Sequence, residues 1–283
     1  MDIKHLSAGN AAATGIAPQA PIKGVFALPG ISEKVTAQLI LQDTGPLERE
    51  LLIAFTDKAT GQPIKQFDEE LTQQLHVLAT DDGLTRFIHE HARKAEPDGR
   101  FKVKMSFPAN GTYYVYADAV PTGLGQQVVR FEVAVGVATG PTEPQHAPVA
   151  LASGSDGPYT VTLEPSALQA ATESMMPMTV LKNGKPATDL GLYLGVAAHA
   201  VFIGTEDLAY VHAHAMAAHA GPGAHASQES HDAPALPPAS LMLHVTPPHA
   251  GRYALWIQFK GGDQIRTVPF TVEVQPASPK CCR

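Results

Sequence analysis

The chain contains an internal duplication, which constrains its fold more than any other feature of the sequence. Residues 52–91 repeat as residues 175–214 at a constant offset of 123 positions without a gap. Farther along, residues 108–113 match residues 248–253 at an offset of 140, so 17 residues are inserted between the two matches. The matched positions include Gly61 with Gly184, Pro63 with Pro186, Thr56 with Thr179, Leu71 with Leu194, Gly111 with Gly251 and Tyr113 with Tyr253. Such self-similarity at a fixed register indicates two copies of one structural unit.

Each copy carries three histidines in the pattern H-x12-H-x-H. These are His76, His89 and His91 in the first copy and His199, His212 and His214 in the second. The alternating residues around His76, followed by Asp82-Gly83, predict a β-hairpin with a two-residue type I′ turn. That turn would place His76 opposite His89, with His91 on the same face two residues farther on. We therefore expect three imidazoles to converge on one side of each hairpin.

Short strands separated by turn signals predict an all-β fold. The 283 residues include 24 glycines and 24 prolines, many of them between β-like runs. Seven to eight strands in a copy of this length are typical of an immunoglobulin-like β-sandwich, so we predict two tandem modules of this kind. Besides the histidine hairpins, the expected strands are 35–42, 50–56, 64–67, 101–107, 112–119 and 126–135, then 159–163, 175–181, 240–245, 252–259 and 265–274.

The boundaries follow from composition. A Pro-, Gly- and Ser-rich stretch without periodicity indicates a linker between the modules. A stretch rich in Ala, Gly, Pro and His after the second hairpin indicates a low-complexity insertion in a loop. The predicted organisation is a flexible N-terminal segment 1–20, module 1 at 21–138, a linker at 139–157, module 2 at 158–276 with its His-rich insertion at 215–239, and a tail at 277–283.

Net charge, apolar runs and cysteine positions limit the ligands and cellular locations to be expected. The net charge of −7 argues against nucleic acid and weakly favours cationic ligands. No apolar run is long enough to span a membrane, and no signal peptide is visible at the start of the sequence, so a cytoplasmic location stays open. Cys281 and Cys282 are adjacent in the tail, where they cannot bridge the core, and we expect exposed thiols.

Three neutral imidazoles on one face are a ligand set for a transition metal. Imidazole suits zinc, copper and nickel, and a three-histidine face leaves a fourth position for water or another ligand. Auxiliary ligands are expected from the insertion and from the second hairpin tip; these are His219, His225, His231 and Asp207.

Structural roles compete with the metal interpretation. The histidines have apolar neighbours on their face, so they can equally be buried side chains satisfied by backbone carbonyls. Met175, Met176 and Met178 suggest a thioether site for Cu(I), but they align with core-like Leu52, Ile53 and Phe55, and we expect at least two of them in the core. The acidic residues at the hairpin tips are expected to hydrogen-bond the backbone of the turns.

No catalytic motif accompanies the histidines. The sequence has no nucleophile elbow, P-loop, Rossmann fingerprint or H-E-x-x-H helix. We therefore predict that the protein is not an enzyme.

Several segments carry a family resemblance; they are GQP at 61–63, LHVLATDDGLTRFIHEH at 75–91, FPANGTYYVYAD at 107–118, QQVV at 126–129, LKNGKPATDLGLYLGVAAH at 181–199, EDLAYVHAH at 206–214 and GRYALWIQF at 251–259. At these positions the chain resembles exported bacterial proteins built from tandem immunoglobulin-like modules, related to YtkA-like and FixH-like domains and described as heavy-metal- or copper-associated. The family pattern has an Asp before the Leu of the hairpin; Asp207 keeps it, whereas Gly83 precedes Leu84. Ala92 and Ala215 stand where the family usually has Pro. The resemblance implies a periplasmic or secreted location and a role in metal handling.

The combined expectation is an extracytoplasmic protein that binds a transition metal, copper first and zinc second, through the two histidine triads. Its expected partners are the metal ion and a metal transporter or other envelope protein. The alternative is a β-sandwich module for structural or protein-interaction purposes, in which the histidines are structural.

Overall fold

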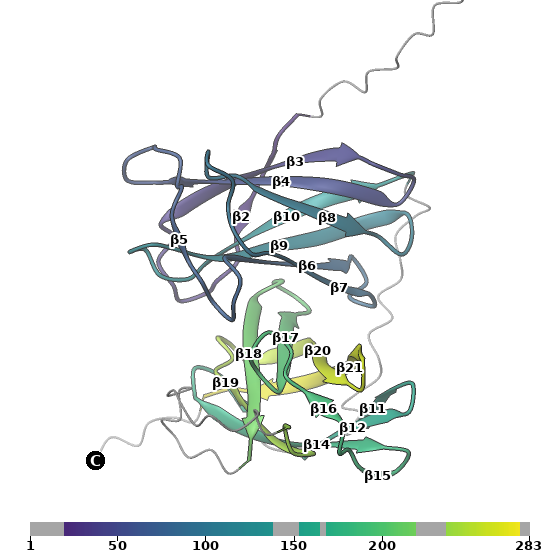
Figure 1. The fold of residues 1–283 in the computed structure, drawn as a ribbon. Coiled ribbons are helices and arrows are strands. Elements are labelled where there is room, and N and C mark those ends of the chain that lie inside the picture. The colour runs from purple at the N-terminus through teal and green to yellow at the C-terminus, as the bar shows by residue number, and fades with distance from the viewer. Residues whose placement is uncertain (1–19, 138–152, 165–167, 219–235, 278–283) are drawn as a thin grey trace, which may run out of the picture.

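The computed structural model describes residues 20–137, 153–164, 168–218 and 236–277. All regular structure in these ranges is β-strand, and no helix occurs in them. The prediction of an all-β, tandem duplicated β-sandwich is confirmed. Figure 1 shows the two modules, one formed by β1–β10 and the other by β11–β21.

Module 1 is a sandwich of two antiparallel sheets. Both sheets contribute side chains to one core, and burial alternates along the strands of the smaller sheet, as expected for strands with one face on a core. The smaller sheet has the order β1 (Ile22–Lys23), β3 (Val35–Asp43), β4 (Glu48–Asp57) and β8 (Phe101–Ser106). The larger sheet has the order β2 (Val25–Phe26), β10 (Gln127–Val135), β9 (Gly111–Pro121), β6 (Leu75–Asp81) and β7 (Phe87–Ala92), with β5 (Phe67–Asp68) paired to β9.

Module 2 repeats these strands but joins them into one sheet that encloses a single core. The junction is β18, which pairs with β17 on one side and with β19 on the other. The order is β11 (Ser153–Asp156), β12 (Tyr159–Leu163), β14 (Ser174–Lys182), β19 (Ser240–Val245), β18 (Tyr210–Ala217), β17 (Ala198–Gly204), β20 (Gly251–Gly261), β21 (Gln264–Gln275) and β13 (Leu168–Gln169). Two short strands, β15 (Lys185–Pro186) and β16 (Leu190–Gly191), pair with β14 and β20.

Most predicted strands lie within two residues of those in the structure, and three segments differ. Strand β11 occupies 153–156, inside the predicted linker, because it pairs with β12. Strand β18 runs to Ala217, so residues 215–217 of the predicted insertion belong to the sheet, where Ala215 is buried. Of the predicted strand 64–67 only Phe67 is in a strand, at the start of β5.

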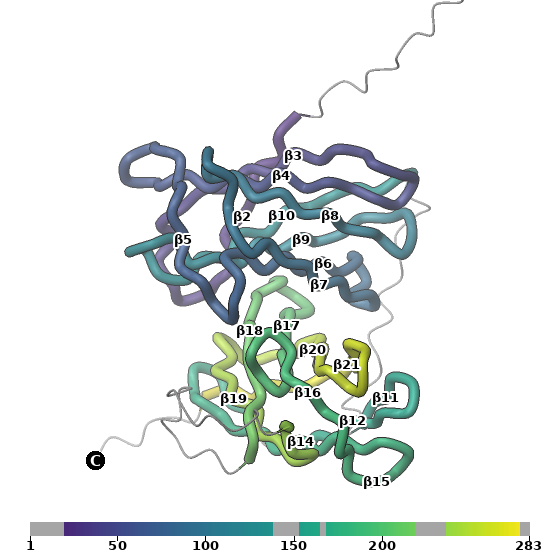
Figure 2. Tube along the Cα trace, in the orientation of Figure 1, coloured from purple at the N-terminus to yellow at the C-terminus, as the bar shows by residue number. Residues whose placement is uncertain are grey.

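The two modules pack against each other through their histidine-bearing sheets. A shared apolar cluster joins them; its buried members are Ala27, Leu78, Leu84, Tyr116 and Val128 from module 1 with Val201, Ile203, Tyr210, Ala254 and Trp256 from module 2. Figures 1 and 2 show β6 and β7 facing β17 and β18 across this contact. The modules are therefore not independent of each other, since apolar faces of both are buried together.

Candidate metal centre

The first histidine hairpin has a different register from the one predicted. His76 pairs with His91, and Leu78 pairs with His89, so the strands are shifted by two residues from the expected pairing. A shift of two preserves the face of every side chain, because side chains alternate with period two. The three imidazoles consequently lie on one face, although the turn was assigned wrongly.

The wider loop that causes this shift is organised by Asp81. Its Oδ1 accepts backbone N–H groups of Thr85 and Arg86 at 2.6 and 2.8 Å, and its Oδ2 accepts the Thr85 hydroxyl at 2.5 Å. The left-handed residue is Leu84, with φ of 52°, and neither Asp82 nor Gly83 has positive φ as a type I′ turn requires. The carboxylate thus holds a six-residue connection in place of a two-residue turn.

Packing of the modules brings the two triads together into one cluster of six histidines. Across the interface, the ring centroid of His76 lies 5.2 Å from that of His212 and 6.4 Å from that of His199. The ring of His89 lies 5.8 Å from His199 and 5.9 Å from His212. The candidate site therefore contains two neighbouring triads, one from each module.

The aromatic contacts across the interface are related by an approximate two-fold axis. Phe87 stacks on Trp256 with centroids 5.0 Å apart, and Tyr116 stacks on Tyr210 at 5.3 Å. In the repeat, Phe87 corresponds to Tyr210 and Tyr116 corresponds to Trp256. Each contact thus recurs with the roles of the modules exchanged, as in an isologous interface between identical subunits.

Hydrogen bonds orient the rings of the first triad. His76 Nε2 lies 3.1 Å from the carbonyl of Glu70, and His89 Nδ1 lies 2.8 Å from Gln258 Oε1. Because both partners are acceptors, these contacts assign the ring protons to His76 Nε2 and His89 Nδ1. The remaining nitrogens, His76 Nδ1 and His89 Nε2, are 3.4 Å apart, and His91 Nε2 lies 2.9 Å from His89 Nε2.

The second triad repeats this arrangement. His199 Nε2 lies 3.0 Å from the carbonyl of Tyr193, and its Nδ1 lies 3.1 Å from His212 Nε2. His212 Nδ1 lies 3.5 Å from Asp118 Oδ2. This distance is short enough for an ion pair, but the two groups are not aligned for a hydrogen bond. His214 Nε2 is buried and has no hydrogen-bond partner.

The ring protons assigned by these contacts leave His76 Nδ1, His89 Nε2 and His199 Nδ1 unprotonated. Each of these nitrogens faces another ring of its own triad, an arrangement that suits a cation. In each triad, the three candidate ligand atoms lie within 4.8 Å of one another. Tetrahedral zinc with Zn–N bonds of about 2.0–2.1 Å separates its nitrogens by about 3.3 Å. Histidines that ligate metals usually donate their other N–H to a carbonyl or carboxylate, as His76, His89 and His199 do to oxygen acceptors here.

Burial favours the neutral form of His76, His89, His91, His199 and His214. His76 and His199 are 1% and 0% exposed. Burial, with neighbouring histidines, lowers the pKa of His91 and His214 to about 3 and that of His199 to about 2. The same causes lower the pKa of His76 and hold the pKa of His89 well below its usual value. Neutral imidazole is the form that binds metal.

Asp207, one of the four auxiliary ligands predicted from the sequence, does not join the triads. Asp207 lies at the hairpin tip, where its Oδ2 is 2.9 Å from His249 Nδ1 and its Oδ1 accepts the N–H of Ala209. His219, His225 and His231 lie outside the described residues, as do Cys281 and Cys282.

Two of the three methionines are in the core, as expected. Met176 and Met178 are 3% and 1% exposed, whereas Met175 is 53% exposed. Met175 pairs directly with His244, which pairs directly with His214 of the second triad. A thioether and an additional imidazole therefore share one face of the sheet with this triad.

Sequence reasoning missed the residues that support the triads. Asp118 and Gln258 occupy equivalent positions at the offset of 140, and each contacts a histidine of the opposite module. Burial raises the pKa of Asp118, but its polar neighbours His212, His76 and Gln126 outweigh burial and lower the pKa overall. The signal was a polar residue two positions after an aromatic residue in both copies, Asp118 after Tyr116 and Gln258 after Trp256. It could be interpreted only with the module packing.

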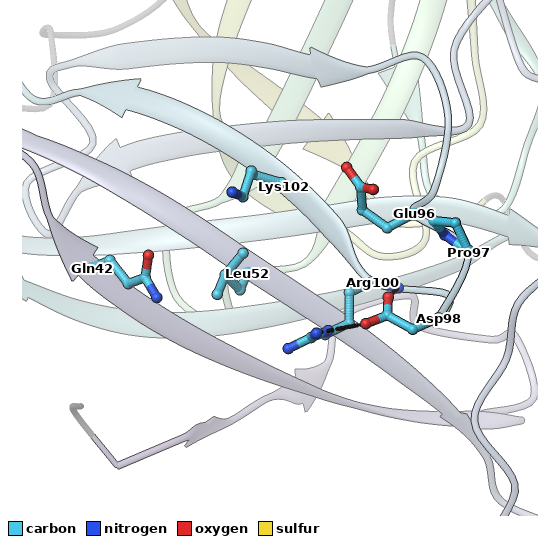
Figure 3. A pocket seen from close by; sticks show the side chains of 7 residues that line it. All are labelled: Gln42, Leu52, Glu96, Pro97, Asp98, Arg100 and Lys102. Atoms are coloured by element: carbon cyan, nitrogen blue, oxygen red, sulfur yellow. Dashed lines mark hydrogen bonds and ion pairs between the residues drawn. The ribbon is translucent and has the colours of Figure 1, made fainter.

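Two hollows of the surface differ in whether they reach the triads. A groove of about 650 Å³ reaches His212 at the module interface, between Leu28 to Ile31 on one side and Pro248 and His249 on the other. Another hollow of about 430 Å³ lies on the smaller sheet of module 1 (Figure 3). Its Arg100 and Asp98 pair with each other, and no histidine lines it, so only the first groove leads to the triads.

Comparison with known proteins identifies the family. A family described as a domain of unknown function, DUF8832, matches residues 33–137 and 152–276. The chain belongs to the DUF8832 family. The two matches coincide with the two modules, so each module is one DUF8832 unit.

Similarity beyond the DUF8832 family is weak. No curated protein matches the chain. A crystal structure of domains 4 and 5 of the S-layer protein SbsC is 10% identical, covers 92% of this chain and 99% of its own, and has a TM-score of 0.23. The FN1–FN3 domains of chicken CNTN1 are 9% identical, cover 90% of this chain and 100% of their own, and have a TM-score of 0.20. Among the described residues, no helix is long and apolar enough to cross a membrane.

Proposed function

We propose that this DUF8832 protein binds transition-metal ions at the two histidine triads, one ion to each triad. The observation that carries the proposal is the contact of 3.4 Å between His76 Nδ1 and His89 Nε2, which are both unprotonated because the ring protons lie on His76 Nε2 and His89 Nδ1. Two lone pairs at such a distance repel unless a proton or a metal ion lies between them. Burial disfavours an added proton there, because it lowers the pKa of both His76 and His89.

Copper is our first choice of metal and zinc the second. Imidazole suits both ions, whereas thioether ligands select Cu(I). Met175 and His244 continue the row of directly paired residues that includes His214, which supports copper. Three histidines with an open fourth position equally suit zinc.

Metal handling is the role we propose, and not catalysis. The central imidazoles are buried against the opposite module, which leaves little room for a substrate beside the metal. We further propose an extracytoplasmic location and exchange of the ion with a metal transporter or another envelope protein, as the family resemblance of the hairpins implies.

A structural role is the competing proposal. His76 and His199 are hydrogen-bonded to backbone carbonyls and lie beside the apolar cluster that joins the modules. On that basis, the six histidines would hold the two modules together without any ion, and the protein would be a structural or interaction module.

Metal analysis of untagged protein, purified without a nickel column, separates these proposals. After dialysis against Cu(I) under reducing conditions or against Zn(II), the metal proposal predicts two ions bound to each chain. The variant His91→Gln should bind one ion, because its other triad is intact, and His91→Gln/His214→Gln should bind none. A wild type without bound metal above the level of the double variant would exclude the metal proposal.

A further inference from the structure

The two triads differ at one supporting position. Asp118 and Gln258 are equivalents in the repeat, and each extends across the interface to Nδ1 of an equivalent histidine. Asp118 Oδ2 lies 3.5 Å from His212, and Gln258 Oε1 lies 2.8 Å from His89. The second triad is thus supported by a carboxylate and the first by an amide.

The carboxylate of Asp118 is buried with neutral donors around it. Its side chain is 0% exposed. Tyr210 donates its hydroxyl to Oδ2 at 3.0 Å, and Gln126 Nε2 donates to both oxygens at 3.0 and 3.1 Å. Among the described residues, no lysine or arginine forms an ion pair with it. The nearest group that can become positively charged is His212, a member of the triad.

The amide of Gln258 is neutral, and both its nitrogen and its oxygen are hydrogen-bonded. Its Nε2 donates to Thr267 Oγ1 at 2.9 Å, which leaves Oε1 to accept the N–H of His89. The amide therefore orients the ring of His89 through a hydrogen bond but supplies no charge. The carboxylate of Asp118 instead lies at ion-pair distance from His212 and supplies a negative charge beside it.

We propose that Asp118 makes His199, His212 and His214 the tighter site for a divalent ion, and that Gln258 leaves the first triad the weaker one. This inference rests on the proposed metal function. A divalent ion on three neutral imidazoles places two positive charges in a buried site. A carboxylate beside a ligating imidazole offsets one of them and makes the imidazole a stronger ligand. A monovalent ion such as Cu(I) gains less from the same carboxylate.

Single-triad variants measure each site separately. His91→Gln removes the first triad and His214→Gln removes the second, and neither residue hydrogen-bonds outside its own triad in the described structure. The dissociation constant for Zn(II) is measured in each by competition with a chromophoric chelator at pH 7.5. We expect His91→Gln, which keeps the second triad, to bind Zn(II) about 10–100-fold more tightly than His214→Gln.

Reciprocal, nearly isosteric exchanges then test the cause. Asp118→Asn in the His91→Gln background should weaken Zn(II) binding about 10–100-fold, and Gln258→Glu in the His214→Gln background should strengthen it by a similar factor. Cu(I), measured with a Cu(I)-specific chelator, should respond less to both exchanges. The gain expected from Gln258→Glu keeps the test decisive if Asp118→Asn impairs folding.

Tyr210→Phe provides the matched control, since it removes one hydrogen bond to Asp118 and keeps the carboxylate. A loss of Zn(II) affinity as large as that of Asp118→Asn would assign the effect to packing and overturn the inference. Equal dissociation constants for the two single-triad variants, unchanged by the exchanges, would overturn it while the metal function stands. Absence of Zn(II) and Cu(I) binding in both would overturn the proposed function itself.

Discussion

His89 of module 1 and Gln258 of module 2 are joined by a hydrogen bond of 2.8 Å between Nδ1 and Oε1. The ring of a candidate ligand in one module is therefore held by a side chain of the other module. His212 and Asp118 form the reciprocal contact at 3.5 Å. Each triad therefore receives its supporting side chain only when the modules are packed together, so we expect metal binding and module packing to be coupled.

The interface should make the two modules unfold together. Trp256 is 3% exposed and stacks on Phe87, so Trp256→Ala removes a large buried contact. We expect a loss of about 3–5 kcal/mol in the free energy of unfolding and a separation of the thermal transition into two. Calorimetry of the wild type, Trp256→Phe and Trp256→Ala measures this.

Trp256→Phe is the control, because it keeps an aromatic ring over Phe87 and should retain a single transition. Two separate transitions in the wild type would contradict the coupling of the modules. An unchanged single transition in Trp256→Ala would show that other contacts dominate the interface.

Stability of the metal-free protein should fall as the solution becomes acidic. The folded-state pKa values of His91 and His214 are about 3 and that of His199 is about 2, below the ordinary value of 6.5. Between about pH 3 and 6.5 the unfolded chain therefore binds more protons than the native one, and the native state loses stability as pH falls through this window. Each such proton contributes about 1.4 kcal/mol per pH unit.

Urea denaturation of chelator-treated protein at pH 7.5, 6.5 and 5.5 measures this slope. Glu70 opposes it in part, because burial raises the pKa of its carboxyl group. The variant His91→Gln/His214→Gln should show a shallower dependence. A free energy of unfolding that is constant or rises on acidification would contradict the neutral, buried state of the histidines.

The His-rich insertion should be dispensable for folding of module 2. Strand β18 ends at Ala217 and β19 begins at Ser240, so deletion of residues 219–235 leaves both strands intact. Loop length has a small effect on closure entropy, and we expect a change below about 1 kcal/mol. Thermal unfolding and Zn(II) binding of the deletion variant measure the outcome, and loss of either would show that the insertion belongs to the core or to the site.

Much of the fold could be predicted from the repeat and from period-two alternation. The face of His76, His89 and His91 followed from alternation, which is unaffected by an even shift in register. The turn could not be predicted, because it depends on the Asp81 side chain, which accepts hydrogen bonds from the backbone N–H groups of Thr85 and Arg86. Aromatic residues at equivalent places in the copies, such as Phe87 and Tyr210, mark the module interface, but their partners are known only from the structure.

The convergence of both triads in one cluster could not be predicted from the sequence, because it depends on how two complete domains pack. Nothing in the linker indicates that packing. Equally, Asp118 looks like an ordinary strand residue until its buried position beside His212 is known.

Calorimetry of the wild type at pH 7.5, with and without Zn(II) at a hundredfold excess over the dissociation constant of the weaker site, tests the central claim most directly. Ions that bind the native state at preformed triads should raise the free energy of unfolding by about 2.7 kcal/mol at that site and by more at the tighter one. The increase should fade as pH falls through about 6, because protons compete for the imidazoles. A transition that Zn(II) and Cu(I) leave unmoved at pH 7.5, together with a metal-free His89→Ala variant that is destabilised, would contradict the account and leave the histidines a structural role.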